Sequence, residues 1–368
     1  MTKPRVLFVS RGRIELPLER WLAPKWDALE SVFEVRALNP GTGGSDPRFR
    51  LLSEQSWRYY PSLALHVAAE LRRYPANVVV ASDPYVGAAA LAGRCLARSN
   101  AKVIVELHGD PATFARLYGS EARRLVARVS DRVALAALRS ADATRAVSSF
   151  TARLVQEARG APPTATFLAY SDLSAFTGTP RTPIPRDETV VFVGALEPYK
   201  NVDGLAAAWR EVVAGMPDAR LTIVGRGSQF AVVEDLVRAF PQSVTHHPVL
   251  PPHEVAGEID KARVLVLPSY PEGLGRVVLE AFARGRPVIG TDGGGIPDMV
   301  AHDQNGLLFP PYDVAALAAA LQRVLEDRGL VERLGDGART TYEQWHQTPA
   351  DFADAYVDLV QRVLAGAR

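Results

Sequence analysis

Residues 264–298 form the stretch that most restricts how this chain can fold. An apolar run at 264–267 predicts a buried strand, and an apolar-periodic run at 274–283 predicts a helix. Between them lies a turn rich in Pro and Gly, and a second short strand is predicted at 287–290, before a triple-glycine loop. Strand, turn, helix and strand in this order indicate an α/β domain with a parallel sheet.

Two carboxylates, Glu272 and Glu280, flank the start of the predicted helix. They would lie on the order of 12 Å apart if the segment between them were wholly helical, which suits two separated groups of one elongated ligand. The first backbone N–H groups of a helix have no partners within it and attract anions. Here these amides belong to Gly273, Leu274, Gly275 and Arg276. The order carboxylate, anion cradle, carboxylate therefore predicts a ligand with an anionic centre and hydroxyl groups on both sides.

The same stretch carries the motif S-x-x-E-G-[FL]-G-x-x-x-L-E-A-x-A-x-G-x-P-V. The matching residues are Ser269, Glu272, Gly273, Leu274, Gly275, Leu279, Glu280, Ala281, Ala283, Gly285, Pro287 and Val288. On these residues the chain resembles the glycosyltransferases of family 4, which are retaining enzymes of the GT-B fold. The resemblance implies that Glu280 binds the ribose of a nucleoside-diphosphate sugar and that Glu272 binds the sugar hydroxyls, with the diphosphate on the amides between them.

The composition is that of an ordinary globular protein, with 47% apolar and 23% charged residues. A net charge of +1 gives no bulk attraction to nucleic acid or membranes, so we expect no nucleic-acid partner. The single cysteine, Cys95, excludes an internal disulfide framework and suits a reducing cytoplasm. We expect no transmembrane helix, because every apolar run is interrupted before about 18 residues, and no signal peptide at the N-terminus.

The length of 368 residues suits two domains, each with its own core. A polar segment with three prolines, residues 171–186, is predicted as the linker between them. We therefore expect an N-terminal Rossmann-like acceptor domain over 1–180 and a C-terminal Rossmann-like donor domain over 187–349. The resemblance implies that the two domains face each other across a cleft and that the helix of 350–368 crosses back to the first.

The N-terminal half offers two candidate site residues. Gly12 lies in the turn after a predicted strand at 6–10, and His108 follows a predicted strand at 103–107. Ligands of open parallel sheets bind at the carboxyl ends of strands, so His108 is placed where it can meet a substrate. A strand-end histidine can instead serve only to hydrogen-bond the turn. The resemblance favours the first role, because family 4 enzymes carry a histidine here that contacts the transferred sugar.

We also predict a helix over 18–29, a loop over 39–50 and a long helix over 113–140. The long helix carries the arginines Arg116, Arg123, Arg124, Arg128, Arg132 and Arg139. Such a run of charge is usually a solvated face. The alternative is a peripheral contact with anionic lipid or with a phosphate-bearing acceptor.

Three turns of the second half add candidates for donor binding. Lys200 matches the lysine of the family motif G-R-L-x-x-x-K-G, whose arginine and lysine neutralise the donor diphosphate, but the arginine position is Ala195. Gly225 lies in a turn that resembles the V-G-x-G of the family, and Val249 lies in the turn where the family seats the base. A bare G-x-G is weak evidence for a nicotinamide site.

Metal binding is not predicted. His246 and His247 are adjacent, but neighbouring residues of a strand point to opposite faces and no acidic residue has ligand spacing. No D-x-D motif stands at a strand end, and the anion cradle itself supplies positive charge. We therefore expect the nucleoside-diphosphate sugar to act as co-substrate without any further cofactor.

The sequence thus predicts a retaining, hexosyltransferase-type enzyme that moves a sugar from a nucleoside diphosphate to an acceptor hydroxyl. The predicted catalytic residues are Glu272, His108 and Lys200, and those for the donor are Glu280, Gly273, Leu274, Gly275, Arg276, Gly225, Gly12 and Val249. The acceptor is a glycan, a glycolipid or a small molecule. The alternatives are a GT-B sugar-nucleotide epimerase, a non-catalytic sugar-nucleotide-binding subunit and, least favoured, a dinucleotide-dependent reductase.

Overall fold

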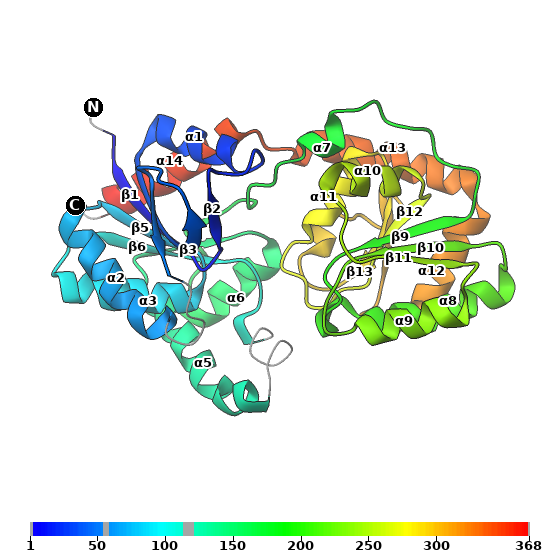
Figure 1. Ribbon diagram of the computed structural model, residues 1–368, viewed down its shortest axis with the longest axis horizontal. Coiled ribbons are helices and arrows are strands. Elements are labelled where there is room, and N and C mark those ends of the chain that lie inside the picture. Colours follow the sequence, from blue (N-terminus) through cyan, green and yellow to red (C-terminus); the bar gives the residue numbers. More distant parts are fainter. Residues whose placement is uncertain (1–2, 54–58, 113–120, 367–368) are drawn as a thin grey trace. The chain divides into compact units, whose positions relative to one another are not determined.

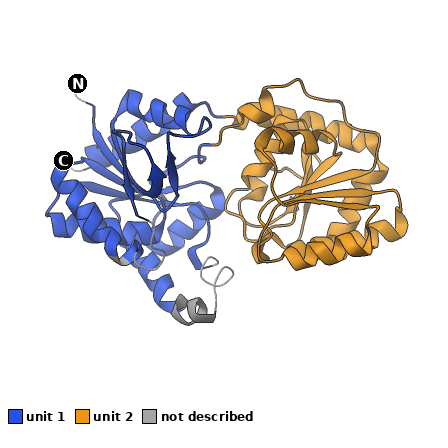
Figure 2. Cartoon of the chain, viewed as in Figure 1, with its two compact units in different colours: residues 1–170, 347–368 blue, residues 171–346 orange. Residues whose placement is uncertain are grey.

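The computed structural model describes residues 3–53, 59–112 and 121–366. The chain divides into two compact units (Figure 2), unit 1 with residues 1–170 and 347–368, and unit 2 with residues 171–346. The chain therefore leaves unit 1 after Tyr170 and returns to it for its last helix.

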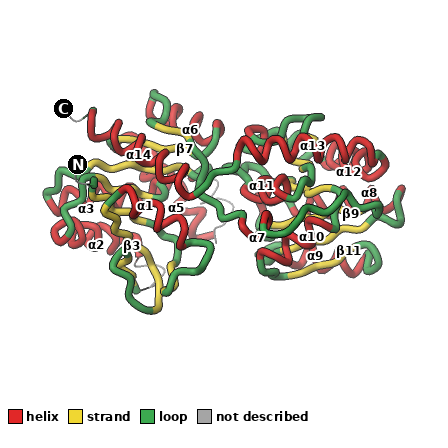
Figure 3. Tube along the Cα trace, turned by 90° about the horizontal axis from the view of Figure 1, so that it is seen from above, coloured by secondary structure: helices red, strands yellow, loops and turns green. Residues whose placement is uncertain are grey.

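Unit 1 is built on a parallel sheet that has eight strands among the described residues (Figures 1 and 3). The strand order is β2-β3-β1-β5-β6-β7-β8, with β4 paired to β3. The strands are β1 Arg5–Val9, β2 Ile14–Leu16, β3 Glu34–Gly43, β4 Phe49–Leu52, β5 Val78–Ala81, β6 Lys102–Leu107, β7 Ala143–Ala146 and β8 Ala165–Thr166. All pairs are parallel, as the alternation of strands and helices predicts.

Helices cover both faces of this sheet. They are α1 Ala23–Val32, α2 Tyr59–Arg73, α3 Pro84–Ala97, α5 Glu121–Ser140, α6 Ser149–Arg159 and α14 Pro349–Ala365. On one face α1 and α14 pack together, and an apolar cluster joins Phe8 of the sheet to Trp26 and Tyr356. On the other face, reached by alternate side chains such as Leu7, lie α2 and α3.

Unit 2 has a six-stranded parallel sheet of order β11-β10-β9-β12-β13-β14. The strands are β9 Thr189–Val193, β10 Arg220–Val224, β11 Val244–His247, β12 Val264–Leu267, β13 Val288–Thr291 and β14 Gly306–Phe309. The helices are α7 Ser174–Thr177, α8 Val202–Gly215, α9 Phe230–Ala239, α10 Pro252–Asp260, α11 Arg276–Ala283, α12 Val314–Glu326 and α13 Arg328–Trp345, with the 3-10 turns η1 Pro198–Lys200 and η2 Ile296–Asp298. Every residue of the central strand β12 is buried, because helices cover both faces of the sheet.

The segment 171–186, predicted as the linker, is instead packed into unit 2. The guanidinium of Arg284 donates to three backbone carbonyls of this segment and to the carboxylate of Asp260. Arg286 donates to two further carbonyls of the segment. Both arginines are buried, and their planar guanidinium groups satisfy several acceptors at once. A polar, proline-rich composition cannot show that partners about a hundred residues later in the chain will hold a segment.

Two predictions for unit 1 need correction, and a third is tested only in part. The predicted loop 39–50 is strand at both ends, because β3 continues to Gly43 to pair with β2 and β4 begins at Phe49. The helix predicted over 18–29 begins only at Ala23, with Pro24 in its first turn, where a proline is tolerated. Of the long helix predicted over 113–140, α5 covers 121–140, and residues 113–120 with Arg116 lie outside the described residues.

Candidate active site

The stretch 264–298 runs along the edge of the unit 2 sheet where β12 and β13 end. Helix α11 begins at Arg276, two residues later than predicted, after Gly275 in the left-handed conformation with φ 83°. This conformation suits glycine because it has no Cβ. The segment from Glu272 to Glu280 is therefore not one continuous helix, and the separation calculated for a wholly helical segment does not apply.

The predicted lysine and the first carboxylate form an ion pair. Lys200 ends the turn η1 that follows β9, and its Nζ lies 2.5 Å from Oε2 of Glu272. The side chains are 10% and 14% exposed, so this lysine is not a surface residue. Burial alone would lower the pKa of Lys200, but the charge of Glu272 and the neighbouring Tyr199 outweigh burial and raise that pKa. Lys200 is therefore a protonated cation at the start of the predicted anion cradle.

The triple-glycine loop after β13 packs directly on the backbone of Glu272. The N–H of Gly295 donates to the Glu272 carbonyl oxygen at 2.8 Å. Gly294 has φ 69°, and a Cβ there would lie 2.5 Å from the same oxygen. A Cβ on Gly293 would lie 2.5 Å from the ring of Tyr270. The glycines thus allow the loop to hold the turn that carries Glu272.

The second carboxylate, Glu280, lies on α11 beside Arg276, with Oε1 at 3.2 Å from Nε of the arginine. Glu280 is only 7% exposed, and burial raises its pKa although Arg276 acts in the opposite direction. The Arg276 side chain is 63% exposed, and Ala195, where the family motif has arginine, is exposed as well. Arg276 is therefore the arginine of the stretch that can add positive charge next to the cradle.

The amides predicted as the cradle belong to the turn before α11. In the part of the chain that the structure describes, the N–H groups of Gly273, Leu274 and Gly275 donate to no backbone carbonyl. They stand between the Lys200–Glu272 pair and the first turn of the helix, whose dipole favours an anion. The arrangement can hold one or two phosphate groups next to an ammonium group.

The β10 turn is closely packed against its neighbours. Gly225 has φ 155°, and a Cβ there would lie 1.9 Å from the carbonyl oxygen of Gly194. His246 donates from Nε2 to the Gly225 carbonyl at 2.8 Å and lies against the ring of Phe230. This histidine is thus used to hold the turn. Val249 is 61% exposed in the turn after β11, where a flat ring can reach it.

Within the described ranges, no three His, Cys, Asp or Glu side chains gather in a way that could hold a metal ion.

His108 lies at the end of β6 in unit 1, as predicted from its place after the strand, and its Nε2 lies 3.1 Å from Oε2 of Glu106. Glu106 is buried, and its other oxygen accepts hydrogen bonds from Arg145 on β7 and from the hydroxyl of Tyr356 on α14. Burial alone would raise the pKa of Glu106, but Arg145, His108 and Tyr356 together hold it well below its ordinary value. The carboxylate is therefore ionised and fully engaged.

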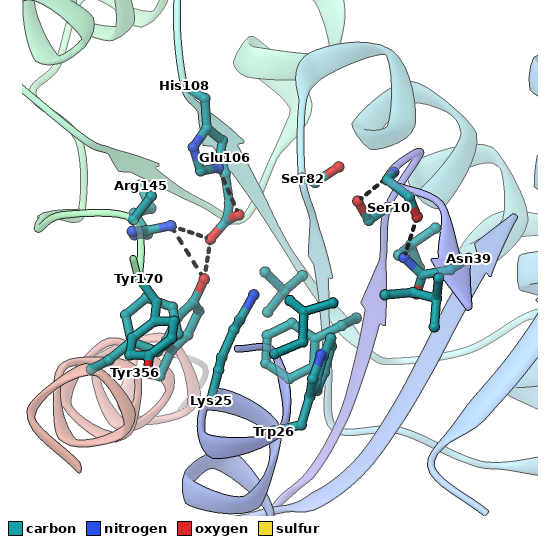
Figure 4. A pocket seen from close by; sticks show the side chains of 18 of the residues that line it. Ser10, Lys25, Trp26, Asn39, Ser82, Glu106, His108, Arg145, Tyr170 and Tyr356 are labelled. Atoms are coloured by element: carbon teal, nitrogen blue, oxygen red, sulfur yellow. Dashed lines mark hydrogen bonds and ion pairs between the residues drawn. The ribbon is translucent and has the colours of Figure 1, made fainter. Parts of the chain in front are cut away.

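A cavity of about 300 Å³ opens beside this network, at the carboxyl ends of the unit 1 strands (Figure 4). It includes Gly12 and His108, two of the predicted site residues. Its other walls come from elements that are far apart in the sequence, with Lys25 and Trp26 on α1, Asn39 on β3 and Arg145 on β7. Sequence reasoning missed these residues. One signal was present, because an acid and an arginine in two short apolar strands, Glu106 and Arg145, stand side by side in the register of β6 and β7.

Two family models match successive parts of the chain. The model described as Glycosyltransferase Family 4 matches residues 14–169, and the model described as Glycosyl transferases group 1 matches residues 180–341. Between them they account for most of the chain, one in each unit.

Several proteins of known name are similar in sequence. A D-inositol 3-phosphate glycosyltransferase of Streptomyces bingchenggensis (strain BCW-1) is 29% identical over 332 residues, which cover 84% of this chain and 64% of that protein. A D-inositol 3-phosphate glycosyltransferase of Jonesia denitrificans is 34% identical over 183 residues, 47% of this chain and 43% of that protein. A glycogen synthase of Mycobacterium tuberculosis (strain ATCC 25618 / H37Rv) is 32% identical over 189 residues, 48% of this chain and 44% of that protein. The chain thus spans less than two thirds of the length of these relatives.

Solved structures share the fold at lower identity. Sucrose-phosphate synthase (tll1590) from Thermosynechococcus elongatus superposes with a TM-score of 0.79 at 21% identity, over 99% of this chain and 100% of that chain. Anabaena Alr3699/HepE in complex with UDP-glucose superposes with a TM-score of 0.71 at 17% identity, over 99% of both chains.

Proposed function

Because this chain belongs to the family 4-like glycosyltransferases of the GT-B fold, we propose that it transfers a sugar from a nucleoside diphosphate to an acceptor hydroxyl. The observation that carries the proposal is the buried Lys200–Glu272 pair beside the amides of the α11 turn. It offers a cation, unpaired donors and a carboxylate in one place, which is what a sugar diphosphate needs.

Each predicted site residue has a proposed role. Lys200 and the amides of Gly273 to Gly275 stabilise the charge that develops on the leaving diphosphate, and such prearranged donors usually supply the largest part of catalysis. Glu272 binds hydroxyls of the transferred sugar, and Glu280 accepts hydrogen bonds from the ribose. His108 contacts the sugar, and Gly12, Gly225 and Val249 contribute backbone or apolar contacts to the donor.

We propose further that transfer proceeds with retention and without a metal ion. The positive charge at the site is supported by Lys200, by Arg276 and by the positive end of the α11 dipole. We assign no protein general base, because the leaving phosphate can accept the proton of the acceptor hydroxyl on the same face of the sugar. Full activity after treatment with a chelator is expected, and activity restored only by added magnesium or manganese would contradict the metal-independent mechanism.

The donor is identified most simply by a thermal-shift screen of nucleoside-diphosphate sugars. A ligand at a hundred times its Kd raises the free energy of unfolding by about 2.7 kcal/mol, so a true donor gives a clear shift. Uridine diphosphate sugars are the first to test, since a structural neighbour was solved with UDP-glucose. No shift with any donor, and no release of nucleoside diphosphate, would contradict the proposal.

The alternatives predicted from the sequence are not favoured. The similar proteins reported above carry the names of glycosyltransferases and synthases, and none is named as an epimerase, a reductase or a non-catalytic subunit. Detection of a glycosylated product, rather than an isomerised donor, separates transfer from epimerisation.

A cytoplasmic location and a peripheral membrane contact remain part of the proposal. In the described part of the chain, no helix is both long and apolar enough to span a bilayer. The exposed thiol of Cys95 suits a reducing compartment.

On α5, Arg128 and Arg132 are exposed next to Val129 and Val133, which are 59% and 39% exposed, a pattern that suits an anionic lipid surface. Co-sedimentation with anionic but not neutral vesicles, lost on changing both arginines to Glu, supports this contact, whereas no binding to anionic vesicles contradicts it.

A further inference from the structure

Residues that line the unit 1 cavity carry polar atoms with no hydrogen bond or ion pair within the described residues. Three of them are buried atoms without a hydrogen bond: Nε1 of Trp26, Oδ1 of Asn39 and Nε of Arg145. The fourth is Nζ of Lys25, which lies over the rings of Trp26 and Phe352, 5.0 and 5.6 Å from their centroids. Buried polar groups are normally paired, so atoms of this kind around one cavity can be satisfied by ordered water or by a bound polar ligand.

The charge balance of the cavity is positive, because Arg13, Lys25 and Arg145 line it together with the single carboxylate of Glu106. Glu106, the carboxylate among the lining residues, already accepts from Arg145 and Tyr356 on one oxygen and lies against His108 on the other. The charges of Glu106 and Arg145 therefore cancel each other. Figure 4 shows the Lys25 side chain extending between those of Tyr356 and Trp26, and no hydrogen bond or ion pair joins it to that network. Burial lowers the pKa of Lys25, and the charge of Glu106 opposes this only in part.

The remaining groups define the chemistry of a ligand that would fit this cavity. Trp26 and Arg145 present N–H donors, and Asn39 presents an acceptor, because its amide nitrogen is already bound to the Gly12 carbonyl at 2.9 Å. Lys25 can donate to an anionic oxygen of a ligand, whereas the Asn39 oxygen can accept a hydrogen bond from a hydroxyl. The aromatic walls suit the apolar face of a sugar or cyclitol ring, and about 300 Å³ is within the range of small-molecule sites.

We propose that this cavity binds a small polyol that carries a phosphate or carboxylate group, with the anion at Lys25 and a ligand hydroxyl at Asn39. That this ligand is the acceptor rests on the proposed transferase function. The binding itself does not, because unit 1 alone supplies all of the residues involved.

The test is titration calorimetry on the full chain without donor, using D-glucose 6-phosphate, D-glucuronate and D-glucose. We expect an anionic sugar to bind at least about tenfold more tightly than glucose, as for a hydrogen bond to a charged group. Preference for glucose 6-phosphate over glucuronate identifies the anion as phosphate, and the reverse preference identifies it as carboxylate. Equal binding of all three, or no binding of either anionic sugar, would overturn the proposal.

Lys25→Met removes the charge and keeps an unbranched side chain, and it should abolish the preference for the anion. The matched control is Lys102→Met, because Lys102 lies on β6 outside the cavity and pairs with Asp142 at 3.4 Å. Trp26→Phe keeps the ring and removes only the N–H, so anion binding should weaken about three- to tenfold. An unchanged preference in Lys25→Met protein that melts as sharply as the wild type would contradict the proposal.

The same preparations separate this inference from the proposed function. Nucleoside-diphosphate binding by wild-type protein without any anion preference among the sugars contradicts only the inference. Anion preference without nucleoside-diphosphate binding contradicts the proposed function and leaves the unit 1 site in place.

Discussion

The two units hold charged side chains at their strand ends in different ways. In unit 2, Lys200 pairs with Glu272 through one short contact between two side chains. In unit 1, Glu106 is held by Arg145, Tyr356 and His108, and Lys25 is left without an ionic partner among the described residues. A single pair can exchange partners with an incoming ligand, whereas a carboxylate held by several buried donors cannot do so without a large loss of stability. The Lys200–Glu272 pair therefore suits ligand binding. The Glu106 network instead stabilises the sheet and leaves Lys25 available to a ligand.

The largest expected effect comes from replacing Arg145, the arginine that pairs with Glu106 in unit 1. Arg145→Met leaves Glu106 buried without its main counter-charge and also removes hydrogen bonds to the carbonyls of Phe167 and Leu168. We expect the free energy of unfolding to fall by about 3–5 kcal/mol. Urea denaturation followed by circular dichroism measures this.

The matched variant in unit 2 is Lys200→Met, for which we expect a smaller loss of about 1–3 kcal/mol, because Glu272 loses its partner but is 14% exposed and can be hydrated. Equal losses for the two variants would show that the two clusters do not differ in the way described.

For activity, in contrast to stability, we expect the larger effect from the lysine of unit 2. Lys200→Ala should reduce the rate of sugar transfer by about 10²- to 10³-fold, as for the loss of one preorganised donor at a developing charge. Lys261→Ala is the control, because that lysine is exposed and pairs with Glu258 on the surface. Initial rates at saturating donor give the comparison, and Lys200→Ala with the activity of the control would remove Lys200 from the mechanism.

Position 195 is alanine where the family motif has arginine, so restoring the arginine should strengthen donor binding by unit 2. Ala195 is exposed, so Ala195→Arg can be accommodated without repacking and should lower KM for the donor about three- to tenfold. Ala195→Met adds a similar side chain without the charge and should leave KM unchanged. If both variants lower KM alike, the gain is apolar contact and the diphosphate is already neutralised.

The smallest effect concerns pH. In its proposed role Glu280 would accept a ribose hydroxyl best as a carboxylate, and burial raises its pKa, so it is protonated at a higher pH than an exposed glutamate. KM for the donor should therefore rise as the pH falls, by about twofold when the pH equals that pKa. Glu280→Gln should remove this rise, and a profile that is the same in both proteins would assign it to another group.

The predicted residues of the unit 2 site lie close together because they are largely contiguous in the sequence. Strand β12 has the predicted bounds, and the turn and helix that follow carry Glu272 and Glu280 within one motif. The start of α11 was misplaced because Gly275 adopts a left-handed conformation that spacing alone does not reveal. Lys200, the partner of Glu272, lies in the turn that follows one further strand, β9.

The unit 1 cavity was not predictable in the same way. Its polar residues come from α1, β3, β6, β7 and α14, and Glu106 and Tyr356 are 250 residues apart. No local spacing connects them, because the helix that brings Tyr356 returns to the sheet from the far end of the chain. What the sequence did contain was a pair of opposite charges in two apolar strands, which lie side by side only after the strand order is known.

The most direct measurement is titration of the nucleoside diphosphate selected by the donor screen against wild-type, Glu272→Gln and Lys200→Ala protein. If Lys200 is held by Glu272 until the diphosphate arrives, Glu272→Gln frees the lysine and should bind the nucleoside diphosphate about tenfold more tightly than wild type. Lys200→Ala should bind about tenfold more weakly. Equal affinities in all three proteins would contradict the claim that this ion pair is where the donor diphosphate binds.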